Sequence, residues 1–278
     1  MGEKTLGALV LVLVLLPLCG CVDPLLQASM LGRTDSVTSL TDPKRGPVDP
    51  DVLRSAFELA AVNGHADTTT ALLDRGAVVD GRYGQGKTAL MESANAGKPE
   101  VVKLLLSRGA AVNIADENGT TPLMWGIAGH DPEAVRLLIA AGADIAARDR
   151  LLGWTPLMMA IDASQPEMVQ ALLEKGADVN ASGKDNRTPL FLAASHGYVD
   201  IAKTLIYLKT DLNAKDHLGA TPLIAAVANN HPEMVQALLS AGADAGLQQA
   251  DGQTALSLAT AAGYSQVVQI LQNTAAPH

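Results

Sequence analysis

Aromatic residues, cysteine and positive charge are all scarce in this 278-residue chain. Trp, Tyr and Phe together make up 3% of the residues, and the formal net charge is -9. A nucleic-acid partner would require a basic surface that displaces counterions from phosphate, so this charge argues against nucleic-acid binding. The hydrophobic content of 48% is mainly Ala, Leu and Val, which suits close packing between helices.

The chain has two cysteines, Cys19 and Cys21, and both stand near its N-terminus. The residues that follow cannot form a disulfide bond or a cysteine-based zinc site. They also lack a His-Glu-x-x-His pair, so no metal site is predicted. No Ser-His-Asp or Cys-His arrangement is visible in the sequence. We therefore expect a protein that is not an enzyme and needs no cofactor.

One short motif, Thr-(Pro/Ala)-Leu, recurs along most of the chain. Its copies begin at residues 88, 121, 155, 188, 221 and 254, and Ser55-Ala56-Phe57 is a degenerate first copy. Successive copies are 33 residues apart, with one step of 34 between residues 121 and 155. A period of this length is typical of a solenoid, in which each unit buries its apolar face against its neighbours.

Each unit is predicted to contain two short helices. The Thr of the motif can cap the first helix, and a following Pro suits its first turn. The second helix repeatedly starts with Pro-Glu, at residues 99, 132, 166 and 232. It ends at a Gly, at residues 76, 109, 142, 176 and 242, because a left-handed turn needs no Cβ. Lys209 takes this place in one unit, which predicts a strained or differently closed helix end.

Together these features resemble the ankyrin repeat family. The resemblance rests on Thr-Pro-Leu at residues 121, 155, 188 and 221, on Leu pairs such as Leu172-Leu173, and on the stretch Gly176-Ala177-Asp178-Val179-Asn180. It implies a mainly α-helical solenoid, with helix-turn-helix units joined by β-hairpin-like loops. About seven repeats would cover residues 51–273, followed by a tail at 274–278.

One departure from that family is systematic. The His that commonly follows Thr-Pro-Leu is absent, and its place is taken by Met91, Met124, Met158, Phe191, Ile224 and Ser257. The hydrogen bonds that this His supports between repeats are therefore expected to be absent or replaced by apolar packing. Trp125 stands at an inner-helix position that is apolar in several other units, and it is predicted to lie in the core.

Residues 1–21 have the features of an export signal. An apolar run from Leu6 to Leu18, about 13 residues, is too short for a bilayer that takes ~20 helical residues to cross. Leu18-Cys19-Gly20-Cys21 resembles the lipobox of bacterial lipoproteins. That resemblance implies a signal peptide at residues 1–20 and a lipidated Cys21. A signal cleaved without lipidation and an uncleaved anchor are the alternatives.

The lipobox resemblance also implies a location in the bacterial envelope, with the protein attached to the membrane by its lipid alone and facing the periplasm. In such lipoproteins an Asp directly after the Cys tends to hold the protein in the inner membrane. Val22 follows Cys21 here, which favours the outer membrane. Residues 21–50 carry four prolines without a helical period, and they are predicted to be a flexible tether that reaches roughly 30 Å.

Residues 81–88 match the phosphate-binding loop pattern G-x-x-x-x-G-K-[ST]. A true phosphate-binding loop follows a buried parallel strand and works with an acidic metal ligand on another strand, and the chain shows no such α/β pattern. The repeat already accounts for Gly86 and Thr88. No nucleotide site is predicted, and a nucleotide-binding protein or an enzyme remains a distant alternative.

The loop before each motif and the end of each first helix are the positions that partners of ankyrin repeats usually meet. By this resemblance the candidate protein-binding residues are Arg148, Arg150, Leu151, Leu152, Trp154, Lys184, Arg187, His196, Lys215, His217 and Leu218, with Asp162 and Ser195 on the first helices. Arg and aromatic residues are common interface anchors. The alternative for Trp154 is that it folds back over its own loop.

The leading hypothesis is a noncatalytic lipoprotein, monomeric when unbound, that binds a protein with an acidic, partly apolar surface. A specific form of this role is an immunity protein that neutralises a toxic effector. A scaffold or stress-protection partner of a periplasmic enzyme is the alternative. The single 34-residue step adds a residue to the loop at Arg150, Leu151 and Leu152, which marks this loop for recognition.

Overall fold

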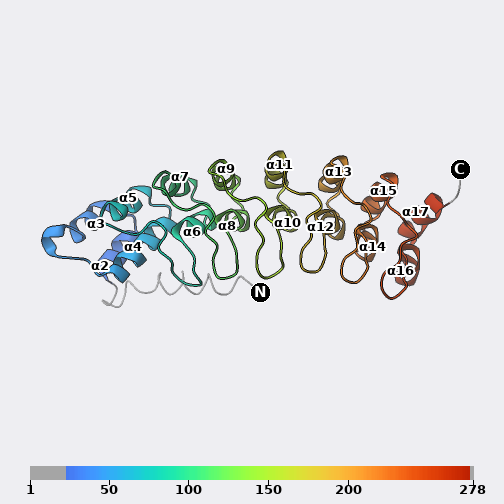
Figure 1. The fold of residues 1–278 in the computed structure, drawn as a ribbon, viewed down its shortest axis with the longest axis horizontal. Coiled ribbons are helices and arrows are strands. Elements are labelled where there is room, and N and C mark those ends of the chain that lie inside the picture. The colour runs from blue at the N-terminus through green and yellow to red at the C-terminus, as the bar shows by residue number, and fades with distance from the viewer. Residues whose placement is uncertain (1–22, 276–278) are drawn as a thin grey trace. The chain divides into compact units, whose positions relative to one another are not determined.

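The computed structural model describes residues 23–275, which form helices joined by loops (Figure 1). Contacts between Cα atoms divide the chain into two compact units, residues 1–111 and 112–278, and each is described by itself. In both units the helices alternate between an inner and an outer layer, as the repeat pattern predicts. None of the helices in the described part is both long and apolar enough to cross a bilayer.

The first unit contains three helix pairs within its described residues. The inner helices are α2 (Pro24–Met30), α4 (Pro50–Val62) and α6 (Ala89–Asn95), and the outer helices are α3 (Thr34–Leu40), α5 (Ala66–Asp74) and α7 (Pro99–Ser107). A 3-10 turn, η2 (Pro43–Arg45), lies between the first and second pairs. Helix α4 packs against both α2 and α6, and α5 packs against both α3 and α7.

The second unit contains five helix pairs within its described residues. Its inner helices are α8 (Pro122–Ala128), α10 (Pro156–Asp162), α12 (Pro189–His196), α14 (Pro222–Ala228) and α16 (Ala255–Ala262). Its outer helices are α9 (Pro132–Ala140), α11 (Pro166–Glu174), α13 (Val199–Tyr207), α15 (Pro232–Ser240) and α17 (Ser265–Ala275). Each inner helix packs against the next one, and the loops that join the pairs lie along one edge of the unit (Figure 1).

The predicted helix starts and stops are confirmed. From the second repeat on, the Thr hydroxyl of each motif accepts the backbone N–H three residues later, at 3.2–3.4 Å. The glycines that end the outer helices have φ between 83° and 96°. Lys209 takes up the same left-handed turn with φ 60°. A side chain in that conformation costs roughly 1–2 kcal/mol, so the predicted strain is present.

Apolar side chains occupy the position where ankyrin repeats commonly carry His. Met91, Met124 and Met158 have no exposed surface, and burying a side chain of this size contributes about 1.5–3 kcal/mol. Next to the helices, side-chain hydrogen bonds to the preceding repeat come from the residue before three of the outer helices, namely His65, Gln165 and His231. Gln165 Nε2 donates to the Ile127 carbonyl at 2.8 Å, and His231 Nε2 lies 3.1 Å from the Ser195 carbonyl.

The predicted flexible tether is wrong over the described residues 23–50, because they fold into α2, α3 and η2. Leu25 and Val37 are buried, and the Thr34 hydroxyl lies 2.8 Å from that of Thr68 on α5. The helices α2 and α3 have seven residues each, which is too short to show a period in the sequence. The folded repeats therefore begin at α2 rather than at residue 51, and α17 extends to Ala275, beyond the predicted end at residue 273.

This first helix pair can be tested by a matched pair of substitutions. Leu25 is buried and Leu31, in the same segment, is 46% exposed. Leu25→Ala should lower the free energy of unfolding by about 2–5 kcal/mol, because it leaves a cavity against α4. Leu31→Ala should change it by less than about 0.5 kcal/mol. Urea unfolding of the purified protein measures both changes. If both variants unfolded with the free energy of the wild type, residues 23–50 would behave as the flexible tether that the sequence predicts.

Candidate functional site

The loops of the second unit are closed by backbone hydrogen bonds. In four of these loops the closing bond joins residues four apart in the chain, as from Asp116 N to Thr120 O at 3.0 Å and from Asp216 N to Ala220 O at 2.9 Å. In the fifth loop the closing bond, from Asp149 N to Trp154 O at 3.1 Å, joins residues five apart. The predicted extra residue is therefore present in this loop, and it leaves Leu151 with 75% of its surface exposed.

Aspartates hold the turns inside these loops. The Asp149 carboxylate accepts the backbone N–H groups of Leu151, Leu152 and Trp154 at 2.6–3.2 Å. Asp216 is buried and accepts those of Leu218 and Ala220, both at 2.9 Å. These carboxylates satisfy turn amides that would otherwise lack a partner. They are therefore engaged within their own loops.

One backbone hydrogen bond joins each loop to the next. The donors and acceptors are Arg150 N to Asn118 O at 2.7 Å, Lys184 N to Leu152 O at 2.8 Å, His217 N to Asp185 O at 2.9 Å and Ala250 N to Leu218 O at 2.9 Å. These bonds set the separation between neighbouring loops.

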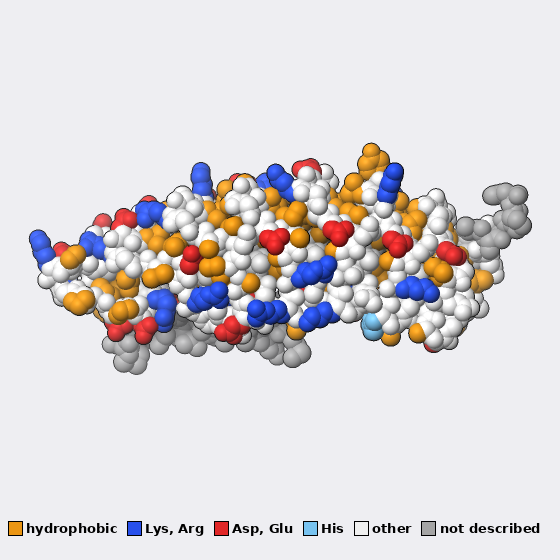
Figure 2. All heavy atoms as spheres, in the orientation of Figure 1, with side chains coloured by type: hydrophobic (Ala, Val, Ile, Leu, Met, Phe, Trp, Pro, Cys, Tyr) orange, Lys and Arg blue, Asp and Glu red, His pale blue; other side chains and the backbone are white. Residues whose placement is uncertain are grey.

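Four basic side chains reinforce these junctions while remaining exposed. Arg148 Nη1 donates to the Ser182 carbonyl of the next loop, and Lys184 Nζ donates back to the Arg150 carbonyl, both at 2.5 Å. Arg150 Nη1 reaches Glu117 O, and Lys215 Nζ reaches Gln248 O, both at 3.1 Å. A carbonyl is neutral, so the positive charges persist at the surface. Figure 2 shows Lys and Arg side chains lying over the loops of this unit.

Two of the predicted anchors, Arg187 and Trp154, are half-buried. The Arg187 guanidinium lies 5.2 Å from the centre of the Phe191 ring, and its Nε is 3.2 Å from Asp185. Trp154 packs against the following loop at Gly183, where an added Cβ would lie 2.8 Å from the indole Cδ1. Trp154 therefore packs on the neighbouring loop as well as bonding within its own, and both side chains help to hold the array.

His196 belongs to a separate cluster. Its Nε2 lies 2.9 Å from Asp162 Oδ1, and its ring stacks on Tyr198 with centroids 5.2 Å apart. The Ser195 hydroxyl accepts from Asn229 at 3.4 Å. This cluster lies at the C-terminal ends of the inner helices, whereas the loops adjoin their N-terminal ends. Since α12 has eight residues, about 12 Å of helix separates the two groups.

The prediction that Trp125 lies in the core is wrong. Its side chain is half-buried, and the indole Nε1 donates to Asp116 Oδ2 at 3.1 Å. His217 Nδ1 lies 3.3 Å from the Asp185 carbonyl, so this side chain also contacts the neighbouring loop. Leu218 is 53% exposed and makes its loop contacts through its backbone. The exposed surface of the loops therefore combines cations with leucines.

The loop at residues 81–88 of the first unit is closed on itself. Tyr83 and Lys87 exchange backbone hydrogen bonds at 3.0 and 2.9 Å, and Lys87 Nζ lies 2.8 Å from Glu92. A phosphate-binding loop presents its amides and its lysine to a phosphate. Here the amides of Tyr83 and Lys87 are paired to carbonyls, so the geometry is that of an inter-repeat hairpin. Across residues 23–275, His, Cys, Asp and Glu form no group of three suited to a metal ion.

Glu58 is a titratable residue that no sequence motif marks. Burial, together with the negative charge of Glu92, raises its pKa from 4.5 to about 7, against the opposing effects of Lys87 and Arg54. Burial also raises the pKa of Tyr83, whose buried hydroxyl has no hydrogen-bond partner. Glu58 takes the place in its repeat that the buried methionines take in others, and this mismatch is the signal that could have revealed it.

Residues 1–22, which contain the predicted signal peptide and Cys21, lie outside the described part of the chain.

Comparisons with known proteins agree with this architecture. A sequence model for ankyrin repeats in three copies matches residues 57–149, 129–216 and 205–277. The human ASB11 ankyrin repeat domain is 28% identical, with a TM-score of 0.73 over 81% of this chain and 100% of that domain. The ankyrin repeat domain of Bcl-3, a member of the IkappaB family, is 24% identical, with a TM-score of 0.66 over 91% and 99%. The comparison with curated protein sequences gives no match.

The raised pKa of Glu58 predicts a pH dependence of stability. In the unfolded chain Glu58 ionises near pH 4.5, whereas the folded protein retains the proton up to about pH 7. Because the folded state then binds more protons, the stability contribution of Glu58 falls as pH rises through this window and is constant above it. Glu58→Gln should make urea unfolding midpoints less dependent on pH between about 5 and 8 and raise the midpoint at the upper end.

Glu100→Gln on the exposed surface of α7 is the matched control, and it should leave the wild-type pH dependence unchanged. The assignment is wrong if Glu58→Gln also leaves that dependence unchanged.

Proposed function

Since this chain belongs to the ankyrin-repeat family, we propose that it is a noncatalytic protein-binding module, anchored in the bacterial envelope by a lipid on Cys21 and facing the periplasm. Ankyrin-repeat domains typically serve as protein-interaction scaffolds, which supports the first part of the proposal. The location rests on the lipobox at Leu18-Cys19-Gly20-Cys21.

The observation that carries the binding role is the loop surface of the second unit, where exposed leucines alternate with exposed cations. Leu151 and Leu218 project from loops whose backbones are joined to their neighbours. Arg148, Arg150, Lys184 and Lys215 stand around them, each held by a carbonyl. A surface that is already ordered loses little conformational entropy when a partner binds.

This chemistry fits a protein partner with acidic groups around an apolar patch. Leucine side chains would be desolvated at the centre, and carboxylates of the partner would meet the cations at the rim. Several adjacent loops would take part, because no single loop offers both kinds of side chain over an adequate area. The contribution of the cations should weaken with added salt.

Neutralisation of a toxic effector is the specific role we infer, because an anchored module with a preformed cationic surface can capture a protein that reaches the envelope. A scaffold for a periplasmic enzyme would use the same surface. The identity of the captured partner distinguishes them: a lipase, nuclease or peptidoglycan hydrolase supports immunity, and an oxidative-stress enzyme supports protection.

The loop surface is tested most cleanly by Leu151→Asp combined with Leu218→Asp. Both side chains are exposed, so the fold should tolerate the two substitutions. We expect capture of the partner from an envelope extract in mild salt to weaken about tenfold or more, or at least ~1.4 kcal/mol. Trp154→Ala and Arg187→Ala should also weaken capture, but both also loosen contacts between loops.

Val78→Asp is the matched control, because Val78 is 69% exposed on a loop of the first unit. It should leave capture unchanged. Absence of any stable partner for the wild type, or equal capture by the double variant and the control, would show that this surface does not bind a protein.

The anchor is tested separately by Cys21→Ser, with Cys19→Ser as its control. Cys21→Ser should abolish incorporation of labelled fatty acid and should move the protein from the membrane fraction to the soluble fraction or leave its signal unprocessed. Cys19→Ser should change neither property. Continued fatty-acid labelling of the Cys21→Ser variant would refute the anchor without affecting the binding role.

A further inference from the structure

The outer helices of the second unit carry an apolar corner that breaks the repeat. Tyr207 is 85% exposed at the end of α13, Leu208 is exposed beside it, and Lys209 follows in the strained left-handed turn. At the positions that correspond to Tyr207 and Leu208, the other outer helices from α5 to α15 have only polar, charged or small residues. At the position that corresponds to Lys209 they have Gly. Three consecutive departures, one of them costly, are thus concentrated in one place.

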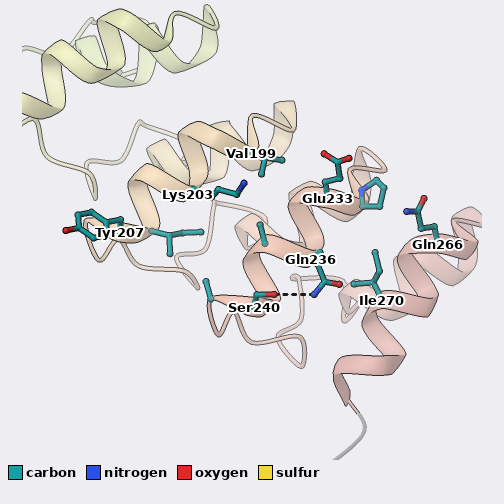
Figure 3. A pocket seen from close by; sticks show the side chains of 12 residues that line it. Val199, Lys203, Tyr207, Glu233, Gln236, Ser240, Gln266 and Ile270 are labelled. Carbon is teal, nitrogen blue, oxygen red and sulfur yellow. Dashed lines mark hydrogen bonds between the residues drawn. The ribbon is translucent and has the colours of Figure 1, made fainter.

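A groove lies next to this corner. It is formed by α13, α15 and α17 and has a volume of about 1000 Å³. Its apolar lining includes Val199, Ile206, Pro232, Ala237 and Ile270. Figure 3 shows Tyr207 at the same end of the groove as Ser240, with Val199 and Glu233 towards the other end.

Ion pairs occur along the outer helices. On α9 and α11, Arg136 lies 2.9 Å from Glu133 and 3.6 Å from Glu167, and on α13, Lys203 lies 3.7 Å from Asp200. The groove has one cation, Lys203 on α13, and one anion, Glu233 on α15, among the residues that line it. Depletion of charge together with an exposed Tyr is the composition of an interface core.

The groove and the corner complement each other across a two-fold axis. Because successive outer helices are related by the 33-residue step, Tyr207 on α13 corresponds to Ser240 on α15, where Ala237 and Ala241 are also small. Lys203 corresponds to Gln236, one turn from Glu233. A rotation of 180° about an axis parallel to α13 and α15, and midway between them, places each α13 opposite the α15 of another copy.

We propose that this face binds a second copy of the chain, with Tyr207 of each copy inserted against Ala237, Ser240 and Ala241 of the other. Lys203 of each copy then meets Glu233 of the other, in addition to its contact with Asp200 at 3.7 Å. The same patch serves both copies, as an isologous interface requires. The monomer expected from the sequence is replaced by a dimer that presents two loop surfaces.

The dimer is weak because the face is small. The nine-residue helices α13 and α15 are about 14 Å long and α17 has eleven residues, so three helices spaced ~10 Å apart give a footprint on the order of 400 Å², about half that of a standard interface. A dissociation constant on the order of 10–100 µM is therefore expected. The interface does not involve the loop surface, so it is independent of the proposed function.

Sedimentation equilibrium of the purified full chain in density-matched detergent tests the proposal from about 1 to about 200 µM. We expect a monomer–dimer equilibrium. Tyr207→Arg should weaken it about tenfold or more, and Val78→Arg, on a residue of the first unit that is 69% exposed, should leave it unchanged. Circular dichroism confirms that each variant is folded.

Charge reversal gives a second readout that depends on the geometry. Lys203→Glu and Glu233→Lys should each weaken the dimer, and the double variant should recover most of the loss because each copy then supplies both reversed partners. A chain that stays monomeric over the whole range, unchanged association of Tyr207→Arg, or failure of the double variant to recover would overturn the proposal.

Discussion

Burial of the inner helices against one another is the interaction on which the rest of the second unit depends. Helices of seven or eight residues are unstable alone in water, because nucleation is costly and few hydrogen bonds follow it. Leu157, Met158 and Ile161 of α10 are almost completely buried, and that burial needs α8 on one side and α12 on the other. The Thr cap at the start of each inner helix then fixes the loop that precedes it. Stacking therefore sets the spacing of the loops as well as the stability of the helices.

The basic side chains of the loops follow from this spacing. A loop held one repeat away from the next presents a carbonyl within reach of an Arg or Lys, and Arg148, Lys184 and Lys215 each use one. An exposed ion pair would place a carboxylate beside the cation, whereas a carbonyl orders the side chain and leaves its charge. The same contacts thus join the array and maintain a positive surface on an acidic protein. These hydrogen bonds position the cations before a partner binds.

Local rules explain which features the sequence could predict. The Thr caps, the left-handed glycines and the extra residue before Trp154 depend on residues close in the chain, and the structure contains them all. The helices α2 and α3 were missed because their stability comes from α4 and α5, which no short window of sequence shows. The position of Trp154 depends on Gly183 in the next loop, and the raised pKa of Glu58 depends on burial and on Glu92. These properties arise between repeats, where a pattern within one repeat gives no information.

A repeat protein also contains its own reference for judging departures, because neighbouring units perform the same structural task with different residues. Glycine closes the outer helix without strain in five units, so the cost of Lys209 is not required by the turn. Methionine fills the inner-helix position in three units, so Glu58 is not required by the packing there. Where a unit accepts such a cost, stacking alone does not account for the residue. Lys209 lies beside the exposed Tyr207, so the dimer proposed above would give this corner a role that stacking within the chain does not.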